Sequence, residues 1–161
     1  MASGGVGGWR VDNALVSAYC AVEHAALDPM RAPDRARRTI AQMKHNLDGK
    51  TFRSAANTPN GEVGAETLFR YHQSGSTVSA DYSGGAIVTG HLLAVMDDHG
   101  RLDMRYHHLN DQDELMVGQG VSIPELMPDG RLRYHETWQW LTGDLSSGHS
   151  TIEEVAGHPT G

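Results

Sequence analysis

The amino-acid sequence predicts an all-β fold, a small up-and-down antiparallel β-barrel of about eight strands that follows an N-terminal helical extension. Three observations predict it. From Asp48 onward, apolar and polar residues alternate with a period of two, as in half-buried strands. Turn-forming residues interrupt this pattern about every 10 to 14 residues, and connections this short join antiparallel neighbours. Before Asp48, apolar residues instead recur at spacings of three and four, which indicates helices.

Residues 1–45 predict two short amphipathic helices. The apolar positions of the first are Leu15, Tyr19, Val22 and Ala26. Asp12 or Asn13 is its predicted cap, and Asp28-Pro29 ends it. The second begins at Asp34, and its apolar side is Ala36, Ile40 and Met43. Three alternatives stay open: the extension packs on the main body, it docks a partner or a second copy in a homodimer, or it precedes a natural start at Met43.

Residues 46–155 predict the barrel domain, and residues 156–161 a flexible tail. Strands are predicted near residues 50–54, 63–73, 76–83, 86–96, 101–109, 114–123, 131–141 and 149–154. Between them, turns are predicted at Asn60-Gly61, Ser74-Gly75, Gly84-Gly85, Asp97 to Gly100, Asn110 to Asp113, Pro128 to Gly130 and Gly143-Asp144. Closing eight such strands into a calycin-like barrel removes the exposed edges that an open sheet must protect.

The alternation also predicts which side chains face the interior, because the more apolar face of each strand is the buried one. The inner face of the fourth predicted strand is Val88, Gly90, Leu92, Ala94 and Met96, with His91 pointing outward. The inner face of the fifth is Leu102, Met104, Tyr106 and His108, and that of the seventh is Leu132, Tyr134, Glu136, Trp138 and Trp140. Earlier strands contribute Phe69, Tyr71, Val78, Ala80 and Tyr82.

This interior is unusually aromatic for a chain with only 6% aromatic residues, and it includes a histidine and a glutamate. Because buried polar groups need partners, we expect His108 and Glu136 to pair with each other, with tyrosine hydroxyls or with water in a pocket. They either form a satisfied polar plug, with Arg105 if the assigned faces are shifted by one residue, or belong to a ligand site. The candidate ligand-binding residues are Tyr71, Tyr82, Tyr106, Tyr134, Trp138, Trp140 and Arg105.

Five ordered blocks carry a resemblance to a known family. They are Asn60 to Val63, Asp81 to Gly85, Arg105 to Asn110, Pro124 to Gly130 and His135 to Trp140. Together they resemble a family of small bacterial proteins that often carry the label N-acetylglutamate synthase, over residues 46–154. The resemblance implies a barrel fold with a pocket and a start near Met43. Acetyl-CoA binding needs a glycine-rich turn before a helix, and residues after 46 predict no helix, so we expect no acetyltransferase.

Composition excludes several other classes. Residues 1–45 carry six basic and four acidic side chains, whereas the rest of the chain carries seven basic and 16 acidic ones. An acidic body repels the phosphate groups of nucleic acid, so we expect no nucleic-acid binding. One cysteine allows no internal disulfide, and no apolar run is long enough for a membrane helix, so we expect a soluble cytoplasmic protein. The ten histidines match no zinc spacing, and we find no nucleotide fingerprint or serine-nucleophile elbow, so we expect neither metal nor cofactor.

Three functions fit these observations. The first is a barrel that binds a hydrophobic or aromatic small molecule and acts as a cofactor-independent cyclase or isomerase, with Glu136 as the acid or base and His108 as its partner. The second is a non-catalytic binding or carrier protein that uses the same pocket. The third is an interaction protein whose barrel is filled with side chains.

Overall fold

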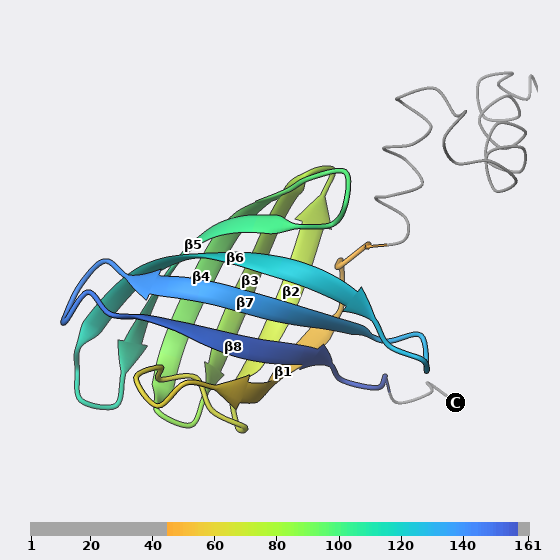
Figure 1. Cartoon of the computed structure of the whole chain (residues 1–161). Helices are drawn as coiled ribbons and strands as arrows, with labels where there is room; N and C mark the ends of the chain where they lie inside the picture. The colour runs from red at the N-terminus through yellow and green to blue at the C-terminus, as the bar shows by residue number, and fades with distance from the viewer. Residues whose placement is uncertain (1–44, 158–161) are drawn as a thin grey trace, which may run out of the picture. The chain divides into compact units, whose positions relative to one another are not determined.

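The computed structural model describes residues 45–157, which form eight strands connected in sequence order (Figure 1). The strands are β1 (Thr51–Asn57), β2 (Leu68–Ser74), β3 (Thr77–Gly84), β4 (Ile87–Met96), β5 (Leu102–Asn110), β6 (Leu115–Leu126), β7 (Leu132–Trp140) and β8 (Ser147–Glu154). The helices predicted within residues 1–45 lie outside the described residues, as do residues 158–161 of the predicted tail.

Each strand pairs antiparallel with the next, and β1 pairs antiparallel with β8, so the sheet is a closed barrel. The predicted up-and-down barrel is therefore confirmed. The turns also fall where turn residues predicted them, and several of their glycines, including Gly75 and Gly130, adopt the positive φ that other residues avoid. Within the described residues, no helix is long and apolar enough to cross a membrane.

Two predictions about strands were wrong. Residues 63–67 precede β2 rather than belonging to it, and they form the end of a loop that begins after Asn57. Val88 does not face the interior but is 56% exposed, because the pairing of β4 with β5 shifts between Ile87 and Thr89. This β-bulge places Ile87 inside instead, and the predicted alternation resumes at Gly90.

The interior has two different halves. At the end where the chain enters the barrel, large side chains fill the space completely. They are Leu47, Phe52, Tyr71, Val78, Leu102, Leu132, Tyr134 and Ile152, all nearly inaccessible to solvent. Phe52 contacts the rings of Tyr71 and Tyr134 edge-on, at centroid distances of 5.2 and 5.9 Å. We call this the closed end.

The opposite end, which we call the mouth, is bounded by four loops. These are residues 58–67, 85–86, 111–114 and 141–146. They connect β1 to β2, β3 to β4, β5 to β6 and β7 to β8, and their positions follow from the strand order of the meander (Figure 1). The closed end therefore carries the packed core, while the mouth can give access to the interior.

Candidate functional site

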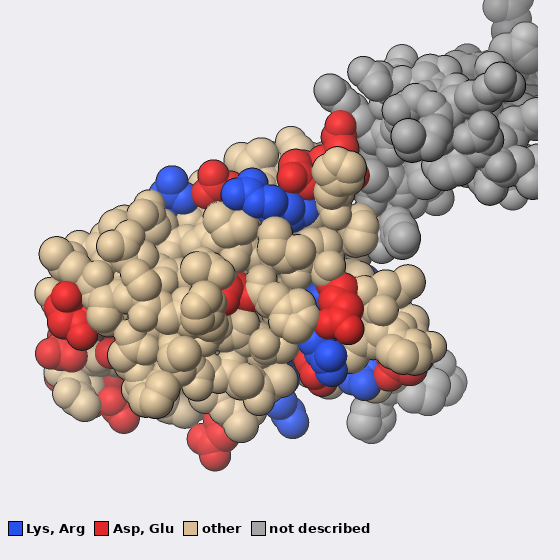
Figure 2. All heavy atoms as spheres, viewed as in Figure 1, with Lys and Arg blue, Asp and Glu red and all other residues tan. Residues whose placement is uncertain are grey.

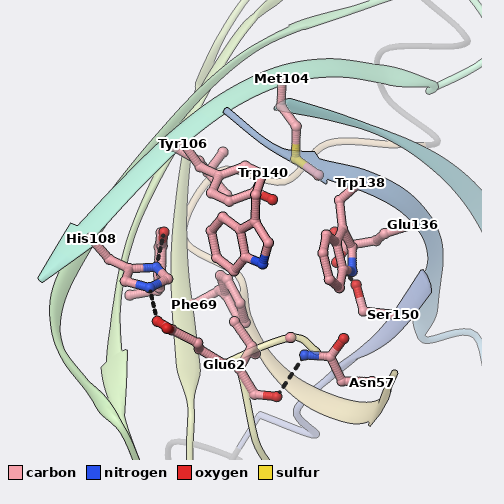
Figure 3. A pocket seen from close by; sticks show the side chains of 14 residues that line it. Asn57, Glu62, Phe69, Met104, Tyr106, His108, Glu136, Trp138, Trp140 and Ser150 are labelled. Carbon is pink, nitrogen blue, oxygen red and sulfur yellow. Dashed lines mark hydrogen bonds and ion pairs between the residues drawn. The ribbon is translucent and has the colours of Figure 1, made fainter. Parts of the chain in front are cut away.

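A cavity lies in the half of the barrel near the mouth (Figure 3). Its walls are Asn57, Phe69, Tyr82, Leu92, Met104, Tyr106, His108, Glu136, Trp138, Trp140 and Ser150 from the strands, with Gly61, Glu62 and Val63 from the loop of residues 58–67. Empty space between these side chains amounts to about 460 Å³, counting the part open to solvent, and about 40 Å³ of it is wide enough for water molecules. The cavity is thus a narrow slot between rings.

Small residues on neighbouring strands explain how the rings lie flat against the wall. Three ring-bearing residues are each registered opposite an inward-facing glycine: Tyr82 with Gly90, Tyr106 with Gly118 and Trp138 with Gly148. A Cβ atom added at Gly90 would lie 2.4 Å from the Tyr82 ring, and one at Gly118 would lie 2.2 Å from the Tyr106 ring. Each of these rings therefore occupies the place of a missing side chain on the neighbouring strand.

Glu136 lies on the wall of the cavity, on the inner face of β7. Its two carboxylate oxygens accept hydrogen bonds from the hydroxyls of Ser122 and Ser150, at 2.9 and 2.7 Å. Burial raises the pKa of Glu136 above 4.5, and the hydrogen bonds from Ser150 and Ser122 oppose this shift only in part. A carboxyl group with a raised pKa keeps its proton to higher pH than an exposed one does, which suits it to act as an acid or base.

His108 is almost completely buried, and both its ring nitrogens are engaged. Its Nδ1 atom lies 3.0 Å from the Tyr82 hydroxyl, and its Nε2 atom lies 2.6 Å from Oε2 of Glu62. Burial lowers the pKa of His108 below 6.5, even though the hydrogen bond to Glu62 favours the charged form. In its neutral form the ring donates a hydrogen bond from Nε2 to the Glu62 carboxylate and accepts one at Nδ1 from the Tyr82 hydroxyl, which also donates to the His107 carbonyl at 3.2 Å.

The loop of residues 58–67 covers one side of the mouth and is tied down by side chains. The indole Nε1 of Trp140 donates to the carbonyl of Asn60 at 3.2 Å, and the Asn60 amide donates to the Ser146 hydroxyl and the Ser147 carbonyl, at the neighbouring β7–β8 connection. Asn110 also donates to Glu62, at 3.1 Å. This loop therefore holds Glu62 at the edge of the cavity as part of a connected network.

The structure distributes the sequence-predicted candidates over three places. Tyr82, Tyr106, His108, Glu136, Trp138 and Trp140 line the cavity. Tyr71 and Tyr134 are buried elsewhere in the interior, and Tyr134 donates to the carbonyl of Gly100 in a loop of the closed end. Arg105 lies on the outer wall, where it pairs with Asp103 at 2.7 Å. The predicted faces of its strand were therefore correct, and Arg105 does not reach the cavity.

His108 and Glu136 are not hydrogen-bonded to each other. Each has its own partners, a tyrosine and a glutamate for His108 and two serines for Glu136. Of the partners expected for His108, the tyrosine hydroxyl is the one present. The cavity thus contains two separate polar groups rather than one acid–base pair.

Sequence reasoning missed four polar residues of the site: Asn57, Glu62, Ser122 and Ser150. Glu62 was named only within the turn block Asn60 to Val63, and a loop has no periodicity that predicts where a side chain points. A signal for Ser122 does exist. It continues the alternate small residues Gly118 and Gly120 on the inner face of β6, and such a run indicates space above the strand.

No group of three or more histidine, cysteine or acidic side chains is placed to hold a metal ion among residues 45–157. His91 and His107, which face outward on β4 and β5, have ring centroids 5.9 Å apart. They have no third partner of this kind in the described part of the chain.

Comparison with known proteins gives one family. A family model described as Avidin-like protein matches residues 45–155, which include all eight strands and the whole lining of the cavity. No curated protein matches the chain.

Proposed function

The chain belongs to the avidin-like protein family, and from this premise we propose that its barrel binds a small organic molecule in the cavity at the mouth. The observation that supports this most directly is the wall of aromatic rings around a slot that side chains leave open. Trp138 and Trp140, with centroids 5.5 Å apart, provide a wall against which a flat group can stack.

A titration with the neutral dye N-phenyl-1-naphthylamine tests this proposal, because its fluorescence rises in apolar surroundings. Removing the indole by Trp138→Ala should weaken binding about tenfold or more, since a buried aromatic contact of this size is worth over 1 kcal/mol. Gln139→Ala is the matched control, because Gln139 neighbours both tryptophans on β7 but is exposed on the outer wall. Equal affinity of the two variants would contradict binding in the cavity.

We also propose a catalytic alternative, in which the protein is a cofactor-independent isomerase or cyclase. Glu136 supports it, because a carboxyl group with a raised pKa on an aromatic wall suits proton transfer to or from a bound substrate. In this mechanism Glu136 is the acid or base. His108 and Glu62 orient a polar group of the substrate at the edge of the cavity, and the rings hold its apolar part.

Proton abstraction can be measured before any natural substrate is known. The flat chromogenic probe 5-nitrobenzisoxazole loses its C3 proton to a carboxylate while its N–O bond breaks, giving a coloured cyanophenolate. Glu136→Gln should reduce this rate about 100-fold, the usual contribution of a positioned base. Glu66→Gln, which alters an exposed carboxylate outside the cavity, should leave the rate unchanged. A wild-type rate no higher than that of free acetate would remove the catalytic proposal and leave binding intact.

A further inference from the structure

We propose that the occupant of the cavity is an organic cation, specifically a protonated amine with a flat apolar part. This inference rests on the proposed binding function and names the chemical class of the ligand. It comes from four features of the described residues: the charges on the cavity wall, an acceptor without a partner, the aromatic rings, and the charge around the mouth.

The cavity wall carries two carboxylates and, among the described residues, no lysine or arginine to neutralise them. Glu136 has hydrogen bonds only from two neutral hydroxyls, and Glu62 only from the neutral groups of His108 and Asn110. A partly buried carboxylate without a cation nearby is destabilising, and a positively charged ligand would offset that cost. An anionic ligand would add to it.

Asn57 supplies a further acceptor. Its amide nitrogen donates to the carbonyl of Val63 at 2.9 Å, whereas its buried Oδ1 atom has no hydrogen-bond partner among the described residues. Figure 3 shows the side chain of Asn57 at the edge of the cavity, on the side of Ser150 and Trp138. A buried acceptor of this kind needs a donor, and an ammonium group has three.

The rings suit the same occupant. Trp138, Trp140 and Tyr106 contribute electron-rich faces, and Tyr106 meets Trp140 edge-on with centroids 5.6 Å apart. Cations bind over such faces, most strongly over tryptophan and where water is excluded. The rings therefore attract a positive charge as well as an apolar group, while the carboxylates select against neutral analogues of the same shape.

The four mouth loops strengthen the attraction at longer range. Together they carry six carboxylates and no lysine or arginine: Glu62, Glu66, Asp111, Asp113, Glu114 and Asp144. Figure 2 shows this polarity, with red and no blue spheres along the left edge, where the β5–β6 and β7–β8 loops lie. A negative rim around a cavity raises the local concentration of cations and speeds their entry.

Three probes of nearly equal size test the inference: benzylamine, which is protonated at neutral pH, benzyl alcohol, which is neutral, and benzoate, which is an anion. Binding to the full chain is followed through the indole N–H signals in NMR spectra. We expect benzylamine to bind at least tenfold more tightly than benzyl alcohol, and benzoate to bind most weakly. Raising the salt concentration should weaken only the binding of benzylamine, because salt screens the charge of the rim.

Two substitutions test whether the preference for a cation arises in the cavity. Glu136→Gln and Glu62→Gln should each reduce the ratio of benzylamine to benzyl alcohol affinity by at least threefold. Glu66→Gln separates the rim from the cavity wall, because Glu66 lies on the same loop as Glu62 but not on the wall, and it should lower the ratio less than either of these variants does. Circular dichroism establishes that each variant is folded, and the two glutamate variants serve as independent tests of each other.

The outcomes separate the two proposals. Equal affinity for benzylamine and benzyl alcohol, or tighter binding of benzoate, overturns the cation inference and leaves the binding function standing. The same holds if N-phenyl-1-naphthylamine binds in the cavity and none of the three probes does. Failure of the dye and of all three probes overturns the binding function, and the cation inference with it.

Discussion

Protonation of His108 makes the stability of the barrel depend on pH. Because burial lowers the pKa of His108 in the fold, the unfolded chain takes up a proton at this residue first as pH falls. The contribution of the neutral ring to stability is complete above the unfolded value of 6.5 and is lost as pH falls through the lower folded value. Protonation also removes the acceptor that Nδ1 offers to the Tyr82 hydroxyl.

We predict that His108→Gln makes the free energy of unfolding depend less on pH. Between pH 7 and pH 5, the free energy of unfolding should fall for the wild type more steeply than for the variant, and urea denaturation at several pH values measures it. His72→Gln is the control, since His72 is exposed on the outer face of β2. Parallel curves for the wild type and His108→Gln would contradict the neutral, buried assignment.

Glu136 has the opposite effect on the pH dependence of stability. Its pKa is raised in the fold, so the folded chain binds the proton more tightly than the unfolded chain does. Its protonated form contributes stability that is complete below the unfolded value of 4.5 and is lost as pH rises through the raised folded value. At higher pH the fold carries the cost of a buried charge.

For Glu136→Gln we therefore expect a gain in stability relative to the wild type that grows as pH rises above 4.5. Glutamine accepts from one serine and donates to the other, so both hydrogen bonds have a replacement. Urea denaturation from pH 4 to pH 8 gives the difference. Were that difference independent of pH, the carboxyl group would not carry a shifted pKa.

At the scale of the strands, the pairing of rings with glycines holds the cavity open. Gly118→Ala would bring a Cβ atom to 2.2 Å from the ring of Tyr106, so the ring must move into the cavity. We predict a loss of about 1–3 kcal/mol in stability, the usual cost of overpacking, together with weaker binding of the dye. Gly64→Ala is the control, because a Cβ atom there would meet nothing within 4 Å. Calorimetry and the dye titration measure the two effects.

The strands also explain how much the sequence could predict. Alternation on β5 and β7 correctly placed Tyr106, His108, Glu136 and the two tryptophans inside, because a period of two leaves no choice once one face is buried. It failed at Val88, where a bulge adds a residue that no local pattern marks. It also failed for the loop that carries Glu62, since only tertiary hydrogen bonds fix the direction of that side chain.

The whole molecule depends on contacts within the described residues for its closed sheet. All eight pairings, including the closure of β1 on β8, join strands between Thr51 and Glu154. We therefore predict that a chain of residues 45–157 folds cooperatively and binds N-phenyl-1-naphthylamine with the affinity of the full chain. Thermal unfolding and the dye titration check this. An unfolded or non-binding product would show that the remaining residues contribute to the barrel or to its cavity.

The distribution of charge along the barrel has a practical consequence for handling the protein. The mouth loops carry six acidic and no basic side chains, whereas the segments at the closed end, residues 45–50, 75–76, 97–101 and 127–131, carry four acidic and three basic ones. The loops of the barrel are therefore more negative at the entrance than at the closed end. Adsorbed on an amine-coated sensor chip, the barrel will turn its entrance to the surface and block it. Attachment through the closed end avoids this orientation.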